Sequence, residues 1–146
     1  MLQPRLAFPL AILFLVCLGC GEAKERLVPV TGKVTVDGKP LSKGTVGFVP
    51  DAARGNSSEH RPLGKIEPDG TYTILTLQRP GAAPGWYKVT VWATANEPPD
   101  AESYKVKDWV PEWLVHVKYT QAETTDVTRE VIASPAPGAF DLDLSK

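Results

Sequence analysis

Cysteine is almost absent from this chain, and its two cysteines stand close together near the N-terminus. They are Cys17 and Cys20, so residues 21–146 contain no thiol. A domain built from those residues has no disulfide framework and no zinc site made of cysteine ligands. Its stability must therefore come from burial.

Histidine is also scarce, which narrows the possible chemistry. The chain has two histidines, His60 and His116, and it has no His-x-His pair and no EF-hand loop. His60 lies in the polar segment 58–61 (SEHR), which lacks the strand-turn-helix context of a nucleophile elbow. His116 alternates with Val115 and Val117, so we expect it on the outer face of a short strand. We expect neither histidine to be catalytic or to bind a metal.

Acidic loop residues leave one possibility for a metal site. Asp51, Asn56, Glu59 and Asp69 carry oxygen ligands of the kind that Ca²⁺ prefers, but they would have to converge from separate loops. Acidic loop residues of β-sandwiches are usually just solvated. We therefore expect no metal and no other cofactor.

The chain has no excess of charge of either sign. Its 16 lysines and arginines stand against 17 aspartates and glutamates, which gives a formal net charge of −1. Proteins that bind nucleic acid usually carry a clustered basic face, and no such cluster or polybasic membrane patch stands out along the sequence. We therefore expect no nucleic-acid partner.

The one long apolar run lies at the N-terminus and ends at Cys20. Residues 6–16 are almost wholly apolar and follow Arg5. Leu18 and Gly19 precede Cys20 as in the lipobox of bacterial lipoprotein signals, although Cys17 holds the place usually taken by leucine. The run of about 14 residues is shorter than the roughly 20 that a membrane-spanning helix needs. We expect cleavage before Cys20 and a lipid on its thiol; ordinary cleavage of a secretory signal nearby is the alternative.

These features divide the chain into three parts. Residues 1–19 are the predicted signal peptide, residues 20–26 a polar tether, and residues 27–146 a single domain of ordinary size. A flexible tether of six residues has a root-mean-square span of roughly 12–15 Å. The predicted partner is thus a membrane, reached through lipid on Cys20. The predicted location is the cell envelope, with the domain exposed to the periplasm or the cell surface.

From residue 27 onward, apolar and polar residues alternate as in half-buried strands. Asp-Gly pairs at 37–38 and 69–70 and proline-rich segments at 79–85 and 135–138 supply turn signals. Residues 51–61 are typical of a polar loop, and residues 94–118 of a long irregular connection. No sustained helical period occurs, which argues against a parallel α/β sheet and favours an all-β, antiparallel sandwich. We predict seven strands, at residues 28–36, 44–50, 63–67, 71–75, 86–93, 126–133 and 139–144.

Three segments of this pattern resemble a known domain family. The segments 30–50 (VTGKVTVDGKPLSKGTVGFVP), 68–74 (PDGTYTI) and 84–91 (PGWYKVTV) match carboxypeptidase regulatory-like domains in order and spacing. Residues 116–144 are similar to the tail of small bacterial lipoproteins built on this domain. The resemblance implies a transthyretin-like, or prealbumin-like, β-sandwich. In large carboxypeptidases this domain accompanies the catalytic domain and is not itself catalytic, so the resemblance implies that the chain is not an enzyme.

Aromatic residues concentrate around the strand predicted at 86–93 and the connection that follows it. Exposed rings there would form a platform for sugar rings or for a protein partner. The favoured alternative is that the connection folds back and covers Trp86 and Trp92, which share one face of the strand. The candidate ligand-binding residues are Trp109, Trp113, Tyr104 and Tyr119.

Two functions are compatible with this pattern. The first is a lipid-anchored, non-catalytic module of the cell envelope with a structural or protein-interaction role. The alternative is a domain that binds carbohydrate or another small envelope ligand through surface aromatic residues.

Overall fold

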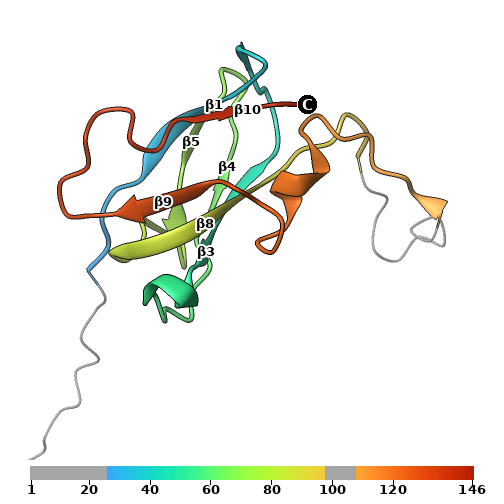
Figure 1. Cartoon of the computed structure of the whole chain (residues 1–146). Helices are drawn as coiled ribbons and strands as arrows, with labels where there is room; N and C mark the ends of the chain where they lie inside the picture. Colours follow the sequence, from blue (N-terminus) through green and yellow to red (C-terminus); the bar gives the residue numbers. More distant parts are fainter. Residues whose placement is uncertain (1–25, 98–107) are drawn as a thin grey trace, which may run out of the picture.

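The computed structural model describes residues 26–97 and 108–146, which form a β-sandwich (Figure 1). The smaller sheet consists of β1 (Thr31–Val36), β2 (Lys39–Pro40), β5 (Thr71–Thr73) and β10 (Leu142–Leu144). The larger sheet has the order β7-β6-β4-β3-β8-β9. Its strands are β3 (Thr45–Pro50), β4 (Leu63–Lys65), β6 (Leu75–Thr76), β7 (Arg79–Pro80), β8 (Gly85–Trp92) and β9 (Thr128–Val131).

The predicted all-β sandwich is confirmed, with strands that are shorter than the alternation suggested. Seven strands have three residues or more and lie within the seven predicted ranges, except that β8 begins one residue earlier, at Gly85; β2, β6 and β7 have two residues each. One pairing departs from the antiparallel expectation, because β10 runs parallel to β1, with Val34 opposite Leu142. The reason is topological: β9 ends at the end of the sandwich where β1 begins (Figure 1), so the chain enters β10 in the direction of β1.

The predicted hairpin around Asp69 and Gly70 joins the two sheets rather than two neighbours in one sheet. Its turn is closed by the Ile66–Tyr72 bridge, but β5 then pairs with β1, whereas β4 pairs with β3 and β6. Gly64 permits this close crossing, since a Cβ there would lie 2.5 Å from the Thr73 carbonyl oxygen. Residues 71–76 thus contribute to both sheets.

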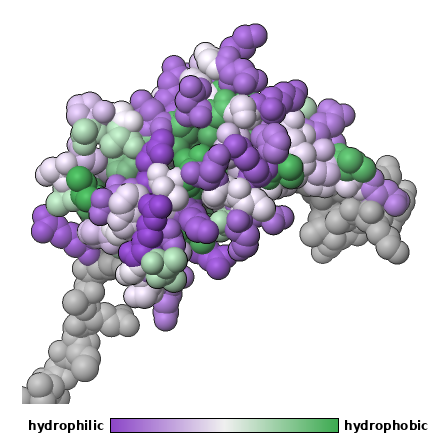
Figure 2. All heavy atoms as spheres, in the orientation of Figure 1, coloured by the Kyte–Doolittle hydropathy of each residue, from purple (hydrophilic) through white to green (hydrophobic). Residues whose placement is uncertain are grey.

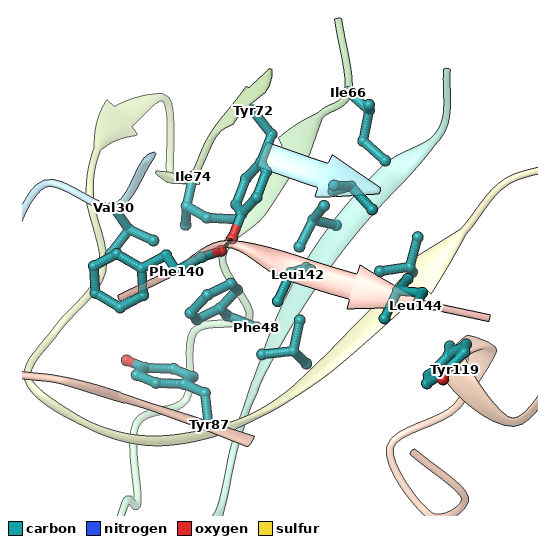
Figure 3. Packing of buried hydrophobic residues seen from close by; sticks show 14 of the residues in the cluster. Val30, Phe48, Ile66, Tyr72, Ile74, Tyr87, Tyr119, Phe140, Leu142 and Leu144 are labelled. Atoms are coloured by element: carbon teal, nitrogen blue, oxygen red, sulfur yellow. Dashed lines mark hydrogen bonds between the residues drawn. The ribbon is translucent and has the colours of Figure 1, made fainter. Parts of the chain in front are cut away.

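The hydrophobic core lies between the sheets and contains the residues that alternation placed inward (Figure 3). Tyr72 and Ile74 are buried as predicted, and so are alternate residues of β8 and β10. The Phe48 ring lies 5.5 Å from the Tyr87 ring and 6.2 Å from the Phe140 ring, centroid to centroid. Burial of a large apolar side chain contributes about 1.5–3 kcal/mol, so these rings carry much of the stability.

Arg129 connects the two sheets on the side where the chain crosses from β9 to β10. Its Nη2 donates a hydrogen bond to the Asp141 carbonyl oxygen at 2.7 Å, and its Nη1 donates to the Thr128 carbonyl oxygen at 2.8 Å. The Asp141 carboxylate in turn accepts from the Lys33 main-chain N–H at 2.9 Å. Polar contacts therefore join β9 to the smaller sheet.

The connection after β8 is more regular than predicted where it is described. Thr94 bridges Trp113, and the Ala95 N–H donates to the Glu112 carbonyl oxygen at 2.8 Å. The Asn96 amide donates to the Val110 carbonyl oxygen and accepts from the Glu112 N–H. These bonds hold the two arms of the connection together as a short ladder that extends β8. Within 26–97 and 108–146, no helix is long and apolar enough to cross a membrane.

Candidate functional site

Part of the predicted site lies outside the described residues. This applies to Cys20, to Tyr104, to the predicted signal peptide 1–19 and to residues 20–25 of the predicted tether. Arg26, the last residue of that tether, is exposed and leads directly into the β-domain. The lipidation prediction therefore stays a prediction.

Three tryptophans pack together on the outer face of the larger sheet. Trp92 ends β8 on that face, as alternation predicts, and is 39% exposed. The centroid of the Trp109 ring lies 6.1 Å from that of Trp92, and the Trp113 ring meets Trp92 edge-on at 5.5 Å. Trp109 and Trp113 are half-buried, and the Trp109 Nε1 is buried without a hydrogen-bond partner. The folded-back connection thus covers Trp92 only in part.

A groove of about 350 Å³ runs beside the exposed part of Trp92. Lys43, Lys65 and Glu97 are the charged residues that line it, and the Lys43 Nζ donates a hydrogen bond to the Ala95 carbonyl oxygen at 2.7 Å. The Trp92 ring supplies an apolar wall. An aromatic wall with polar groups at its rim can stack a sugar ring and hydrogen-bond its hydroxyl groups.

Tyr119 does not belong to this aromatic cluster, contrary to the sequence-based grouping. It is 6% exposed and packs in the hydrophobic core, with its hydroxyl 3.4 Å from the Ser145 Oγ. Trp86 is also separate, because it lies six positions before Trp92 along β8, a distance of roughly 20 Å. The Arg54 guanidinium covers Trp86 at 4.4 Å from the ring centroid. Of the four candidate residues, the structure therefore brings together Trp109 and Trp113.

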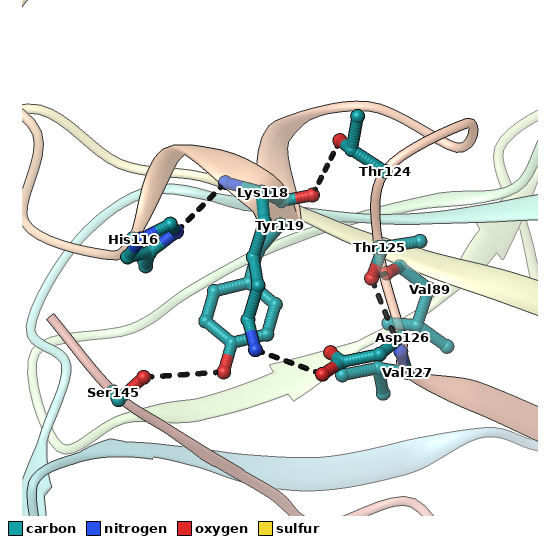
Figure 4. A network of polar contacts seen from close by, with 9 residues as sticks. All are labelled: Val89, His116, Lys118, Tyr119, Thr124, Thr125, Asp126, Val127 and Ser145. Atoms are coloured by element: carbon teal, nitrogen blue, oxygen red, sulfur yellow. Dashed lines mark hydrogen bonds and ion pairs between the residues drawn. The ribbon is translucent and has the colours of Figure 1, made fainter.

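His116 caps a 3₁₀ turn, so its predicted place on a strand is wrong (Figure 4). Its Nδ1 accepts a hydrogen bond from the Lys118 main-chain N–H at 3.1 Å, at the start of η3 (Val117–Thr120). A side chain that accepts from the second residue of a turn competes with the extended conformation, which explains the failure of the alternation rule here.

An exposed ion pair lies beside this turn (Figure 4). The Lys118 Nζ is 2.8 Å from the Asp126 Oδ2, and it also lies 4.8 Å from the centroid of the Tyr119 ring. The hydrogen bond between the pair raises the pKa of Lys118 and lowers the pKa of Asp126. Both groups face solvent, where screening keeps such pairs weak. This arrangement supports the fold and offers no chemistry of its own.

Three of the four loop residues considered for calcium, all except Glu59, have structural partners. The Asn56 amide donates to the Trp86 carbonyl oxygen at 2.8 Å and accepts from the Ser58 N–H at 3.1 Å. Asp51 is buried 3.6 Å from the Arg54 Nε, and Asp69 accepts two hydrogen bonds from Thr71 in a separate turn. Among the described residues, no three histidine, cysteine or acidic side chains gather into a metal-binding group.

A second groove, of about 440 Å³, was not anticipated from the sequence. Leu63 and Leu75 face each other across β4 and β6 on the outer face, and Leu77 lies in the turn after them. The alternation of side chains along a strand could have indicated this surface: because Ile74 points inward, its neighbour Leu75 must point outward. The face seen in Figure 2 is mostly hydrophilic, with hydrophobic residues in small separate patches, so adjoining exposed leucines are a local exception.

The outer face of the larger sheet therefore carries both candidate surfaces, the tryptophan cluster (Trp92, Trp109 and Trp113) at one end of β8 and the leucine groove over β4 and β6. Neither surface holds an assembled set of acid, base and nucleophile. No family model, curated protein or solved structure matches this chain.

Proposed function

We propose that this protein is a lipid-anchored, non-catalytic module of the bacterial cell envelope, which acts through contacts of its β-domain with other envelope components. The observation that carries the proposal is the apolar run that ends in Leu18-Gly19-Cys20. The ordered domain starts soon after it, since β1 begins at Thr31. A lipid on Cys20 would thus keep the domain close to the membrane surface.

The resemblance to carboxypeptidase regulatory-like domains supports a non-catalytic role. The motif segments 68–74 and 84–91 contribute Tyr72 and Tyr87 to the core, where their hydroxyls hydrogen-bond main-chain carbonyls. Those tyrosines therefore serve folding rather than chemistry. A transthyretin-like topology, which the resemblance implies, remains part of the proposal.

The anchor is tested by substituting each cysteine in turn. Cys20→Ala should abolish incorporation of labelled palmitate and release the domain from membranes, because the acylated thiol is gone. Cys17→Ala is the matched control and should leave labelling intact, since that residue precedes the cleavage site. A diacylglycerol carries enough buried CH₂ groups, at about 0.8 kcal/mol each, to hold a protein stably. Unchanged labelling in Cys20→Ala would contradict the anchor. With the anchor established, a pull-down from solubilised membranes would identify the envelope partner of the β-domain.

A second candidate function, glycan binding, is favoured by the exposed part of Trp92 beside its groove. If Trp92 stacks a sugar ring, glycans should shift the tryptophan emission, and Trp92→Ala should remove both the shift and retention on a glycan array. Trp86→Ala is the matched control, because its ring lies at the other end of β8 under Arg54. No retention of the parent protein on the array would rule out this function.

A further inference from the structure

The turn between β6 and β7 has a conformation that its residues disfavour. Leu77 and Gln78 have φ angles of 48° and 65°, the left-handed values that a type I′ turn requires at both central positions. Asn-Gly suits such a turn, whereas a bulky leucine is strained there. Leu77 is 73% exposed, so burial within the domain does not offset the strain. Strain without a packing gain indicates a role outside folding.

Leu77 extends the apolar surface of the leucine groove. Leu63 is 55% exposed and Leu75 is 37% exposed, and the two are direct cross-strand neighbours. The charged side chains that line this groove are Arg61 and Lys65, and none of its lining residues is acidic. Lys65 lies at the Trp92 end of the groove, because its partner Thr45 also pairs with Trp92. Arg79, also exposed, follows the turn directly. The apolar surface thus has a basic rim.

The predicted tether leaves the domain at the same end of the sandwich as this turn. In the antiparallel β1–β5 pair, Thr31 lies opposite Thr73. The chain before Thr31 and the chain after Thr73 therefore extend toward the same end of the sandwich. Leu27 lies four residues before Thr31, and Leu77 lies four residues after Thr73. The Ile74 N–H donates to the Val30 carbonyl oxygen at 2.9 Å, and Val28 bridges Ala82, so the two segments stay side by side.

The covalent distance between Cys20 and this end is short. Leu27 lies seven positions after Cys20, and a fully extended chain of that length spans at most roughly 25 Å. A lipid on Cys20 would therefore bring Leu77 and its basic rim to the bilayer surface. Leucine at the acyl boundary with arginine at the phosphates is the pattern of interfacial membrane contact.

We propose that the leucine groove and the Leu77 turn dock on an anionic lipid surface and orient the β-domain relative to the membrane. This inference rests on the proposed lipid anchor at Cys20. The anchor holds the chain at the membrane, and the docking surface decides which face of the sandwich points away from it. The tryptophan cluster lies on the same outer face, at the end of β8 that is remote from the tether.

The depth to which a label at position 77 enters the lipid bilayer tests the proposed orientation of the β-domain. The full-length chain is expressed with the substitution Leu77→Cys, and its acylation at Cys20 is verified by mass spectrometry. The introduced thiol at position 77 is then labelled with an environment-sensitive fluorophore. In phosphatidylglycerol-containing vesicles, nitroxide on the lipids should quench this label several-fold more than a label at Lys39→Cys, an exposed position at the start of β2. Purely zwitterionic vesicles or high salt should reduce the difference, because both weaken the attraction of the basic rim.

A second variant separates docking from folding. In the double variant Leu77→Asn and Gln78→Gly the turn strain is relieved, so the thermal midpoint should rise. Quenching of a label at Leu63→Cys should nevertheless fall, because the inserted leucine is lost. If Leu77 served the fold alone, the midpoint would fall and the quenching would not change.

The outcomes also distinguish this inference from the anchor itself. Equal quenching at positions 77 and 39 in verified acylated protein would overturn docking and leave the anchor intact. An unmodified Cys20 would refute the anchor, and the docking inference with it. A Leu77 label that is shielded by an envelope protein but not quenched by lipid nitroxides would assign the groove to a protein partner and overturn lipid docking.

Discussion

The Tyr72 hydroxyl donates a hydrogen bond to the main-chain carbonyl oxygen of Phe140, 2.5 Å away and 68 residues along the chain. Tyr72 is buried, and Phe140 lies just before β10, so this bond ties β5 to the last part of the chain (Figure 3). A motif tyrosine thus closes the core between segments that are remote in sequence.

Tyr72→Phe should lower the free energy of unfolding by about 1–3 kcal/mol, because the Phe140 carbonyl is left buried without its donor. Urea unfolding followed by tryptophan fluorescence measures the loss. Tyr119→Phe is the matched control and should change less, since its hydroxyl lies 3.4 Å from the Ser145 Oγ, a much longer contact than the Tyr72 bond. Equal losses in the two variants would contradict the importance of the buried bond.

The same tyrosine predicts a loss of stability at alkaline pH. Burial raises the pKa of Tyr72 above its ordinary value of 10.0. In the unfolded chain this hydroxyl ionises near pH 10, whereas in the folded domain it stays protonated, so the stability is fully present below pH 10 and declines as the pH rises further. Unfolding measured in urea between neutral and alkaline pH should show this decline. Tyr72→Phe should show a shallower decline; an unchanged slope would refute the assignment.

From the environment of Asp69 we expect a loss of stability at acid pH, as the pH falls rather than rises. Hydrogen bonds from the Thr71 hydroxyl and main-chain N–H lower the pKa of its carboxyl below the ordinary value of 3.8. The stabilising contribution is therefore present above pH 3.8 and is lost as the pH falls toward the folded-state pKa. In Asp69→Asn the unfolding free energy should depend less on pH in this range. Asp37→Asn, in another exposed turn, serves as the comparison; an equal effect there would argue against a specific role of Asp69.

Gly32→Ala should destabilise the domain by about 1–3 kcal/mol through overpacking. A Cβ at this position would clash with the Phe140 carbonyl oxygen and would also lie 3.0 Å from the Tyr72 ring. At Gly38 a Cβ would meet open space, but the φ of 78° disfavours alanine. Gly38→Ala should therefore cost about 1–2 kcal/mol from backbone strain alone and leave the near-UV spectrum of the core unchanged. An altered near-UV spectrum in Gly32→Ala would report the repacking around Tyr72.

Much of the fold could be predicted because alternation is a local property. The inward positions of Tyr72, Ile74 and Tyr87 follow from a side-chain period of two, which holds whatever the partner strand is. His116 broke that rule because its ring bonded the main chain of its own turn. The candidate site was harder to predict, because Tyr119 is close to Trp113 in sequence, yet the 3₁₀ turn that contains Tyr119 directs its ring into the core.

The sequence by itself determined the class of fold, the lack of cysteines for a disulfide within residues 21–146 and the position of the predicted lipid anchor, because each depends on residue type and local spacing. Only the tertiary structure decided which strands meet. Pairing of β1 with β10 and the bond from Tyr72 to Phe140 join residues more than 60 positions apart, whose approach is governed by the packing of the whole core. The leucine groove arose in the same way, because Leu63 and Leu75 become neighbours only when β4 pairs with β6.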